Sequence, residues 1–316
     1  MHKESEIMAM EEKIIVGKDT DYPLEGILTI PDHVEGKVPA VVFVHGSGAS
    51  NRDEKVGKVA PFRDLAEGLA AKGIASLRYD KRTFVHGRKM VKNTAGITIE
   101  EETIQDAILA ADLLKQDPRI DAERVFIIGH SMGAILTGRI DAEGGNFKGL
   151  IMMAGSLHSL DEILLRQLNE QKETGGFLTR LVLGKLIGKF EKQFVAMKTM
   201  SDEEARKTKM GNGATLYYFK DMAEHPAADY LRENPKPMLI LQGSDDLQAT
   251  VASDYKSYQE LLGDHQNVTF RLYDGLNHAF VSSLSTDPSK AGKEFSKERH
   301  IPSVVIDDIA AFIQNN

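Results

Sequence analysis

The most constraining stretch of this chain is an apolar run that ends in Gly-x-Ser-x-Gly. Phe126–Ile128 is apolar and β-prone, Gly129–Gly133 carries the motif, and a helical pattern of small residues begins at Ala134. A strand, a tight turn and a helix in this order are the context of a nucleophile elbow, which presents its serine at a helix N-terminus. A β-carbon at either glycine would collide with the neighbouring strand and helix. The pattern therefore predicts that Ser131 is a nucleophile.

Two later loops supply the partners that such a serine needs. A serine hydroxyl is a poor nucleophile at neutral pH, so it requires a base, and the base requires an acid that holds its tautomer. Behind an elbow the chain order is Ser, then Asp or Glu, then His. Asp245 and Asp246 follow the apolar run Met238–Leu241, and His278 follows Val268–Tyr273. The order predicts a triad, although spacing alone does not choose between the two aspartates.

The rest of the chain alternates between short apolar runs and helical stripes, which predicts βαβ crossovers. The expected strands are Lys13–Val16, Leu24–Ile30, Ala40–Val44, Ile74–Tyr79, Val125–Ile128, Leu150–Met153, Met238–Leu241 and Val268–Tyr273. The expected helices among them are Pro61–Ala70, Ile104–Leu114, Ser253–Leu262 and Val305–Ile313. The fold class is therefore α/β, with an antiparallel entry pair, a mostly parallel central sheet and helices on both faces.

The alternation lapses between residues 157 and 235, where the sequence is helical and charged. Ligands bind at the carboxyl ends of parallel strands, so an insertion at that edge is expected to form a cap. We predict an N-terminal extension at 1–12, a core at 13–156 and 236–316, and a helical cap insertion at 157–235. Its helices are expected at Leu160–Leu168, Phe177–Phe194 and Asp202–Lys209. The apolar face of the second is expected to pack on the core; a membrane-surface helix or a dimer contact is the alternative.

Composition narrows the function class. The 316 residues carry a formal charge of −8, which argues against nucleic acid because phosphate binding needs a basic footprint. The chain has no cysteine, which excludes disulfides, a thiol nucleophile and thiolate metal sites. No residues stand at metal-ligand spacing, so no metal and no cofactor are expected. The charged start lacks a signal peptide's apolar region, and no run is long enough to cross a bilayer. We expect a cytoplasmic enzyme that acts on a small molecule, without stable membrane association, and with a homodimer as a possible assembly.

Backbone N–H groups are expected to form the oxyanion hole. One is that of Met132, which follows the serine, and the other is that of Ser47, in the glycine-rich loop after Ala40–Val44. The substrate pocket is expected to include His45, Gly46, His130 and Phe280, with His45 bracing the loop rather than transferring protons.

Charged residues cluster beside two predicted strand ends. They are Arg52, Asp53, Asp80, Lys81 and Arg82. They could orient a substrate carboxylate, but a salt-bridge network is the favoured interpretation, because paired charges near strand ends are usually structural.

Several of these segments together resemble a known family. The loops at His45–Gly48, Gly129–Gly133, Gly243–Asp246 and Gly275–His278 are similar to those of the α/β-hydrolase superfamily. Asn51–Glu54, Pro61–Ala66 and Arg78–Thr83 resemble, more narrowly, a bacterial carboxylesterase group of the EstD type. The resemblance implies an α/β-hydrolase fold and a serine hydrolase. In that group the acid stands three residues after the glycine of Gly-x-x-Asp, which implies Asp246.

The expected function is that of a serine carboxylesterase. Ser131, His278 and Asp246 would hydrolyse small esters with short- to medium-chain acyl groups through an acyl-enzyme. Peptidase, amidase or thioesterase activity on the same residues is an alternative, because a triad does not distinguish acyl leaving groups. A non-catalytic homologue that binds an apolar ligand is a third.

Overall fold

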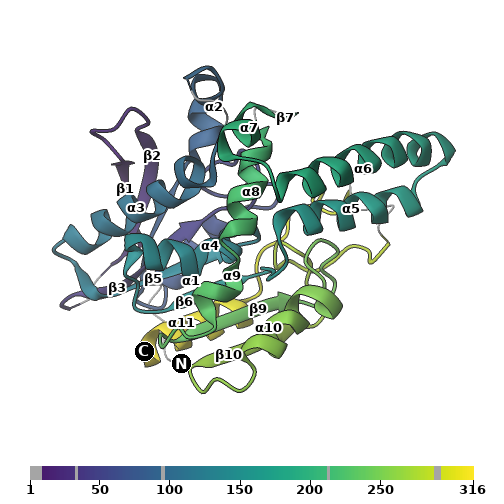
Figure 1. Cartoon of the computed structure of the whole chain (residues 1–316). Helices are drawn as coiled ribbons and strands as arrows, with labels where there is room; N and C mark the ends of the chain where they lie inside the picture. The colour runs from purple at the N-terminus through teal and green to yellow at the C-terminus, as the bar shows by residue number, and fades with distance from the viewer. Residues whose placement is uncertain (1–8, 33–34, 94–96, 212–213, 288–292) are drawn as a thin grey trace.

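An eight-stranded sheet forms the centre of the protein (Figure 1). The computed structural model describes residues 9–32, 35–93, 97–211, 214–287 and 293–316. The strands lie in the order β1 (Ala9–Val16), β2 (Leu24–Pro31), β4 (Ala75–Tyr79), β3 (Val38–Val44), β5 (Ile120–His130), β6 (Leu150–Met153), β9 (Met238–Gly243) and β10 (Val268–Tyr273). The pairs β1–β2 and β2–β4 are antiparallel and all other pairs are parallel. The predicted antiparallel entry and mostly parallel sheet are confirmed.

Helices cover both faces of the sheet because its central strands are apolar on both sides. Val41 and Phe43 of β3 face one core with α1 (Pro61–Ala70) and α11 (Ser303–Asn315). Val42 and Val44 face the other. The helices on that second face are α3 (Gln105–Gln116), α4 (Met132–Ile140) and α10 (Lys256–Leu262). The π-type turn η2 (Asp141–Gly145) follows α4, and the π-type turn η3 (Val251–Tyr255) precedes α10. Alternation along one strand thus separates two apolar layers.

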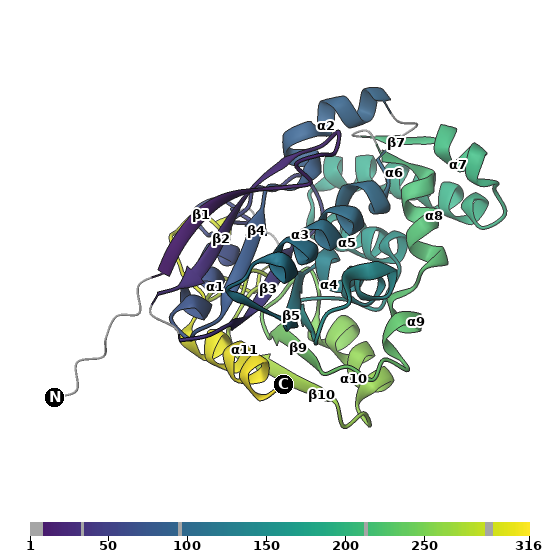
Figure 2. The same cartoon turned by 90° about the vertical axis from the view of Figure 1, so that its left-hand side faces the viewer.

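The first strand is longer than the sequence pattern predicts. β1 begins at Ala9, where its described part pairs with Pro31, so 9–12 of the expected extension belong to the sheet. Residues 1–8 lie outside the described part of the chain. The pair β1–β2 forms one edge of the molecule (Figure 2). Glu11 and Glu12 are adjacent and therefore point to opposite faces of this edge strand, where they pair with Arg78 and Arg119. A search for apolar runs does not detect such a strand.

A second difference concerns the described residues between 82 and 103, for which the polar sequence gives no predicted element. Arg82–Asn93 forms α2, and Glu100–Ile104 forms the π-type turn η1, which leads directly into α3. The helix α2 is polar on average, and its few large apolar residues, Phe84, Val85, Met90 and Val91, are too sparse to mark a helix by an apolar run. η1 carries Glu102, whose side chain is buried.

The cap segment (157–235) leaves the sheet after β6 and returns at β9, its neighbour. It contains α5 (Leu160–Thr174), α6 (Phe177–Met197), α7 (Asp202–Lys207), β7 (Lys209–Gly211), β8 (Ala214–Thr215), α8 (Leu216–Glu224) and α9 (Ala227–Leu231). The hairpin of α5 and α6 projects from the body (Figure 1). The expected helix Asp202–Lys209 ends at Lys207 because Lys209 starts β7. The boundaries of the cap as a domain stay a prediction.

The long helix α6 does not lay its whole apolar face on the core. Its C-terminal half packs on cap residues, with Phe194 and Met197 in a small cluster beside Phe219. Phe177 and Leu178 at its start are 81% and 74% exposed. The expectation of a helix packed on the core is corrected, because the hairpin carries these residues away from the sheet. None of the described helices is long and apolar enough to cross a bilayer.

Buried charge pairs fasten the antiparallel edge to the parallel sheet. Arg78 on β4 is 2% exposed and donates to Asp53 Oδ1 (2.9 Å), Thr29 Oγ1 (2.8 Å) and Glu11 Oε1 (2.6 Å). Arg52 pairs with Asp80 at 2.7 Å, and Arg82 pairs with Asp106. These contacts support the salt-bridge interpretation of the charged cluster.

We expect Arg78→Met to lower the free energy of unfolding by about 3 kcal/mol, because it leaves the carboxylates that the buried guanidinium neutralises without a cationic partner. The matched control is Arg119→Met. Arg119 binds the next β1 carboxylate, Glu12, at 2.6 Å, but both side chains are more than one third exposed. The control should lose less than about 1 kcal/mol. Urea unfolding measures both, and equal losses would contradict a special role for the buried pair.

Candidate active site

The turn after β5 holds Ser131 in a conformation that few residues adopt. Its φ is 54° and its ψ is −118°, and its N–H donates to Met153 O on β6 at 2.9 Å. A β-carbon on Gly129 would lie 2.3 Å from Gly133 O, and one on Gly133 would lie 2.2 Å from Val44 O. Real β-carbons do not approach backbone oxygens so closely, so both positions require glycine. The strain is therefore held by backbone packing on both sides of Ser131.

The loops after β9 and β10 bring the expected acid and base together. His278 Nδ1 lies 2.7 Å from Asp246 Oδ2 and both side chains are buried. The loops approach because of Gly243, where a β-carbon would lie 2.3 Å from Leu276 O. Asp245 instead accepts from Ser244 Oγ at 3.0 Å. Of the two aspartates, Asp246 is the one that contacts His278.

The Asp246 carboxylate is built to stay charged. Its Oδ1 accepts from the N–H groups of Gln248 (2.7 Å) and Ala249 (3.0 Å), and its Oδ2 also accepts from Gln242 Nε2 (3.1 Å). Burial alone would raise its pKa, but the facing His278 ring and these donors outweigh burial and lower the pKa. A carboxylate in this state fixes the proton of His278 on Nδ1, which leaves Nε2 as the acceptor.

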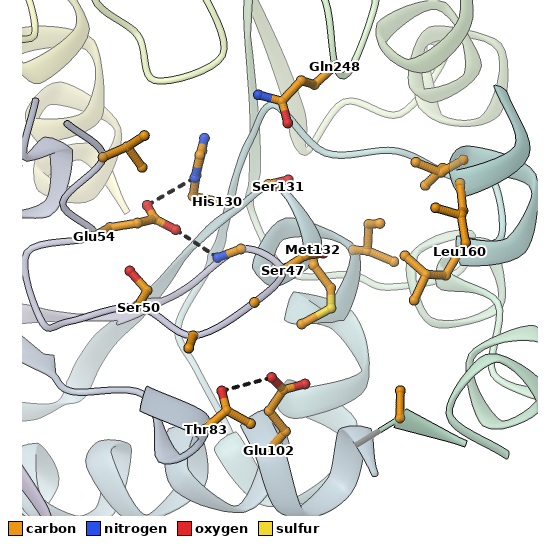
Figure 3. A pocket seen from close by; sticks show the side chains of 18 of the residues that line it. Ser47, Ser50, Glu54, Thr83, Glu102, His130, Ser131, Met132, Leu160 and Gln248 are labelled. Atoms are coloured by element: carbon orange, nitrogen blue, oxygen red, sulfur yellow. Dashed lines mark hydrogen bonds and ion pairs between the residues drawn. The ribbon is translucent and has the colours of Figure 1, made fainter. Parts of the chain in front are cut away.

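The predicted oxyanion donors lie beside Ser131. A β-carbon on Gly46 would lie 3.1 Å from Ser131 Cβ, which puts the glycine-rich loop against the elbow. Met132 is the first residue of α4, so its N–H has no acceptor within the helix. In the described part of the chain, the N–H of Ser47 donates to no protein acceptor. Ser47, Ser131 and Met132 line the same cavity (Figure 3).

This cavity has a volume of about 1140 Å³ and extends from Ser131 under the cap segment. Its lining includes His278, Gly46 and His130 on the core side. Apolar side chains from α4, α5 and α8 form much of the remaining wall: Ile135, Leu160, Ile163, Leu164 and Phe219. Ser131 and His278 both line it, and no hydrogen bond joins their side chains in the described structure. Catalytic hydrogen bonds often tighten only when substrate binds.

Two of the expected pocket residues lie elsewhere. His45 is 1% exposed, packs against the Phe62 ring in a tilted arrangement and donates from Nε2 to Asn51 O at 3.1 Å. It braces the loop from behind and does not belong to the cavity wall. Phe280 is fully buried in the core beside Tyr273. Both are corrected for the same reason: they flank loop residues that face the cavity, and their own side chains turn into the core.

A buried ion pair lies directly beside the elbow. His130 Nδ1 is 3.0 Å from Glu54 Oε2 (Figure 3). His130 Nε2 donates to the carbonyl of His278 at 2.7 Å. The other Glu54 oxygen accepts from Gly46 N–H at 2.7 Å. Burial opposes both charges, but each partner favours the other's charged form, so the pKa of His130 is raised and that of Glu54 is lowered. The pair joins the elbow, the glycine-rich loop and the histidine loop.

A comparison with known protein families identifies the family of this chain. The family described as serine aminopeptidase S33 matches residues 37–283. The chain belongs to the serine aminopeptidase S33 family. This match covers most of the chain and includes the elbow, both later loops and the whole cap segment.

Individual relatives of this S33 family member are similar to it in sequence or in fold. Esterase EstD of Thermotoga maritima is 35% identical over 290 residues, which are 92% of this chain and 65% of that protein, so the chain spans slightly less than two thirds of its relative. Est1E from Butyrivibrio proteoclasticus has a TM-score of 0.58 at 16% identity, covering 96% of this chain and 98% of that one. An acylaminoacyl peptidase of Pyrococcus horikoshii has a TM-score of 0.58 at 13% sequence identity, and the match covers 98% of this chain and 42% of that one. The α/β-hydrolase fold and the resemblance to EstD-type esterases are confirmed.

The role of Glu54 in the S33 family member was not predicted from its sequence. Glu54 lies in a loop with a φ of 49° and within the charged run Arg52–Lys55, a pattern that is typical of a solvent-exposed segment. His130 was expected in the pocket as a motif residue, without a partner. The resemblance of Asn51–Glu54 to a family segment indicated that this loop is important. It did not reveal the contact between Glu54 and His130, because residues 76 positions apart produce no periodic pattern in the sequence.

We expect Glu54 and His130 to be coupled energetically. A double-mutant cycle with Glu54→Gln and His130→Asn should give a coupling of about 2 kcal/mol in the free energy of unfolding. The raised pKa of His130 contributes stability below its ordinary value of 6.5, which is lost as pH rises through the folded value. The lowered pKa of Glu54 contributes stability above 4.5, which is lost as pH falls. The coupling should therefore be largest between these values; a pH-independent coupling would contradict an ion pair.

We expect the buried His45 to make this protein sensitive to acid. Burial lowers the pKa of His45 to about 4 from 6.5, so the unfolded chain takes up a proton first as pH falls. Stability should fall by roughly 3 kcal/mol between pH 6.5 and 4 through this residue alone. We expect His45→Gln to flatten the unfolding free energy over that range, with His265→Gln in the turn before β10 as the control. Parallel curves for all three proteins would refute the assignment.

Proposed function

We propose that this protein is a serine carboxylesterase that hydrolyses small esters with short- to medium-chain acyl groups. The observation that carries the proposal is the 2.7 Å contact between His278 Nδ1 and Asp246 Oδ2, beside a cavity that Ser131 also lines. Membership of a serine hydrolase family and 35% identity to an esterase support the reaction class.

In the proposed reaction, Ser131 Oγ attacks the ester carbonyl carbon and His278 Nε2 takes the hydroxyl proton. The N–H groups of Ser47 and Met132 stabilise the oxyanion, each contributing about 3 kcal/mol to the barrier reduction. His278 then returns the proton to the leaving alcohol, and the acyl-enzyme remains. Water, deprotonated by His278, attacks the acyl-enzyme and releases the carboxylic acid. Asp246 orients the imidazole and stabilises its cationic form throughout.

The cavity supports an ester substrate with an apolar acyl group. Its walls from α5 and α8 are apolar, and the volume of about 1140 Å³ accommodates a medium chain together with an alcohol. The partner in this proposal is therefore a small neutral molecule. A homodimer, a cytoplasmic location and the absence of a nucleic-acid partner remain predictions from composition.

Amide or peptide hydrolysis is the second candidate, and the family description carries it. An aminopeptidase needs a carboxylate to hold the substrate's terminal ammonium. Among the described residues that line the cavity, the carboxylates are Glu54 and Glu102, and each already contacts a cation, His130 at 3.0 Å and Lys81 at 3.1 Å. This pairing favours neutral esters over free amino termini.

We expect wild-type protein to hydrolyse p-nitrophenyl butyrate and Ser131→Ala to lose at least about 10⁴-fold in kcat. Fluorophosphonate labelling should occur at Ser131 and should be absent from the variant. Equal turnover by the two proteins would refute the nucleophile. Absence of both labelling and turnover would point to the ligand-binding alternative, whereas labelling of Ser131 would rule that alternative out. Comparing turnover of esters, aminoacyl anilides and acyl thioesters with a matched acyl group distinguishes an esterase from a peptidase, an amidase or a thioesterase.

A further inference from the structure

The peptide between Gly46 and Ser47 is held from its carbonyl side. Lys81 Nζ donates to Gly46 O at 2.8 Å. The C=O and N–H of a trans peptide point in opposite directions in one plane, and the described chain has no cis peptide. A donor fixed on Gly46 O therefore fixes the direction of the Ser47 N–H, one of the two proposed oxyanion donors. The ammonium also polarises the peptide, which strengthens that N–H as a donor.

Lys81 is held in place by a second buried charge. Its side chain is 2% exposed and lies 3.1 Å from Glu102 Oε1, on a side chain that is 5% exposed. Glu102 Oε1 also accepts from Thr83 Oγ1 at 3.1 Å (Figure 3). A buried ammonium with one carboxylate and one carbonyl as acceptors has little freedom to move, so it acts as a fixed charge.

The cap segment reaches the same carboxylate. Tyr218 on α8 donates from its hydroxyl to Glu102 Oε2 at 2.7 Å. Burial and the nearby Glu102 raise the pKa of Tyr218 well above its usual value, so the hydroxyl keeps its proton. The next residue, Phe219, lines the cavity along with Tyr218 itself. One element of the cap thus carries both a wall of the pocket and a hydrogen bond to the group that holds Lys81.

We propose that Tyr218, Glu102 and Lys81 form a positioning chain for the oxyanion hole, which ties the orientation of the Ser47 N–H to the seating of the cap segment. The proposal rests on the proposed esterase function. None of the three residues exchanges a proton with substrate. Their effect is exerted on the transition state, because the Ser47 donor is needed most where the oxyanion develops.

The first arm of the test removes the charge pair as a unit. The double variant Lys81→Met/Glu102→Gln leaves no unpaired buried charge, so it should fold. We expect kcat for p-nitrophenyl butyrate to fall about 30- to 100-fold with KM changed less than about threefold. The control is Lys236→Met/Asp141→Asn, which removes a different lysine–carboxylate pair, 2.8 Å apart, away from the cavity. The control should lower stability without changing kcat.

The second arm removes one hydroxyl from the cap. Tyr218→Phe keeps the aromatic wall and should lower kcat about five- to tenfold. Its control is Tyr230→Phe, which loses a 2.7 Å hydrogen bond to His225 in the same cap segment and should keep wild-type kcat. Both tyrosine variants change the stability of the cap, but only the first changes the proposed donor.

A trifluoromethyl ketone distinguishes positioning from a purely structural role. Ser131 Oγ adds to its carbonyl carbon, the hydroxyl proton passes to His278 Nε2, and the carbonyl oxygen becomes an oxyanion in the proposed hole. Its Ki should rise in each test variant by the factor by which kcat/KM falls. An unchanged Ki in either arm, in folded protein with wild-type circular dichroism, overturns the proposal. Absence of esterase turnover in the wild type overturns the proposed function and this inference with it; normal wild-type turnover with unaffected variants overturns the inference alone.

Discussion

The site depends on the close approach of three backbone segments at Gly129, Gly133 and Gly46. Gly129, Gly133 and Gly46 bring β5, α4 and the loop after β3 so close that a methyl group at the first two would overlap a carbonyl oxygen. This approach forces the positive φ of Ser131 and places α4's free N–H groups beside it. Strain of this kind persists only where surrounding structure over-determines it, and here the two-sided apolar sheet does so. The stability of the core is thus the source of the site's geometry.

Buried charges then orient what the backbone has brought together. The two peptides that meet at Gly46 are held by opposite charges, its N–H by Glu54 and its C=O by Lys81. Each of these charges has a buried counter-ion from another segment, His130 on β5 and Glu102 in η1. In a low dielectric such pairs are costly to separate, so they act as rigid spacers between loops. The loop between β3 and α1 is consequently defined by charge contacts as much as by packing.

The sequence predicted what local patterns encode. Apolar runs located the strands of the sheet, and the order of Ser131, Asp246 and His278 after three strands located the candidate site, because strand ends of a parallel sheet meet at one edge. It did not predict α2, whose sequence is polar on average with few large apolar residues. Nor did it predict the partners of His130 and Lys81, since contacts between distant residues leave no periodic pattern in the sequence. It also could not separate His45 and Phe280 from the residues beside them, because which side chain faces a cavity is decided by loop conformation.

The attachment of the cap segment has an engineering consequence. The segment departs after β6 and re-enters at β9, and these strands are direct neighbours, with Leu150 paired to Met238. Replacing the cap segment with a differently shaped insert would leave the strand registers of the central sheet intact, so the core can serve as a scaffold for other cap insertions. A graft chosen by length and apolarity alone would nevertheless lack a hydroxyl facing Glu102. A compatible insert must therefore supply that hydroxyl and also a carboxylate for the buried Arg139 of α4, which pairs with Asp221 of α8 at 2.6 Å. Both requirements can be screened in a library before any pocket is redesigned.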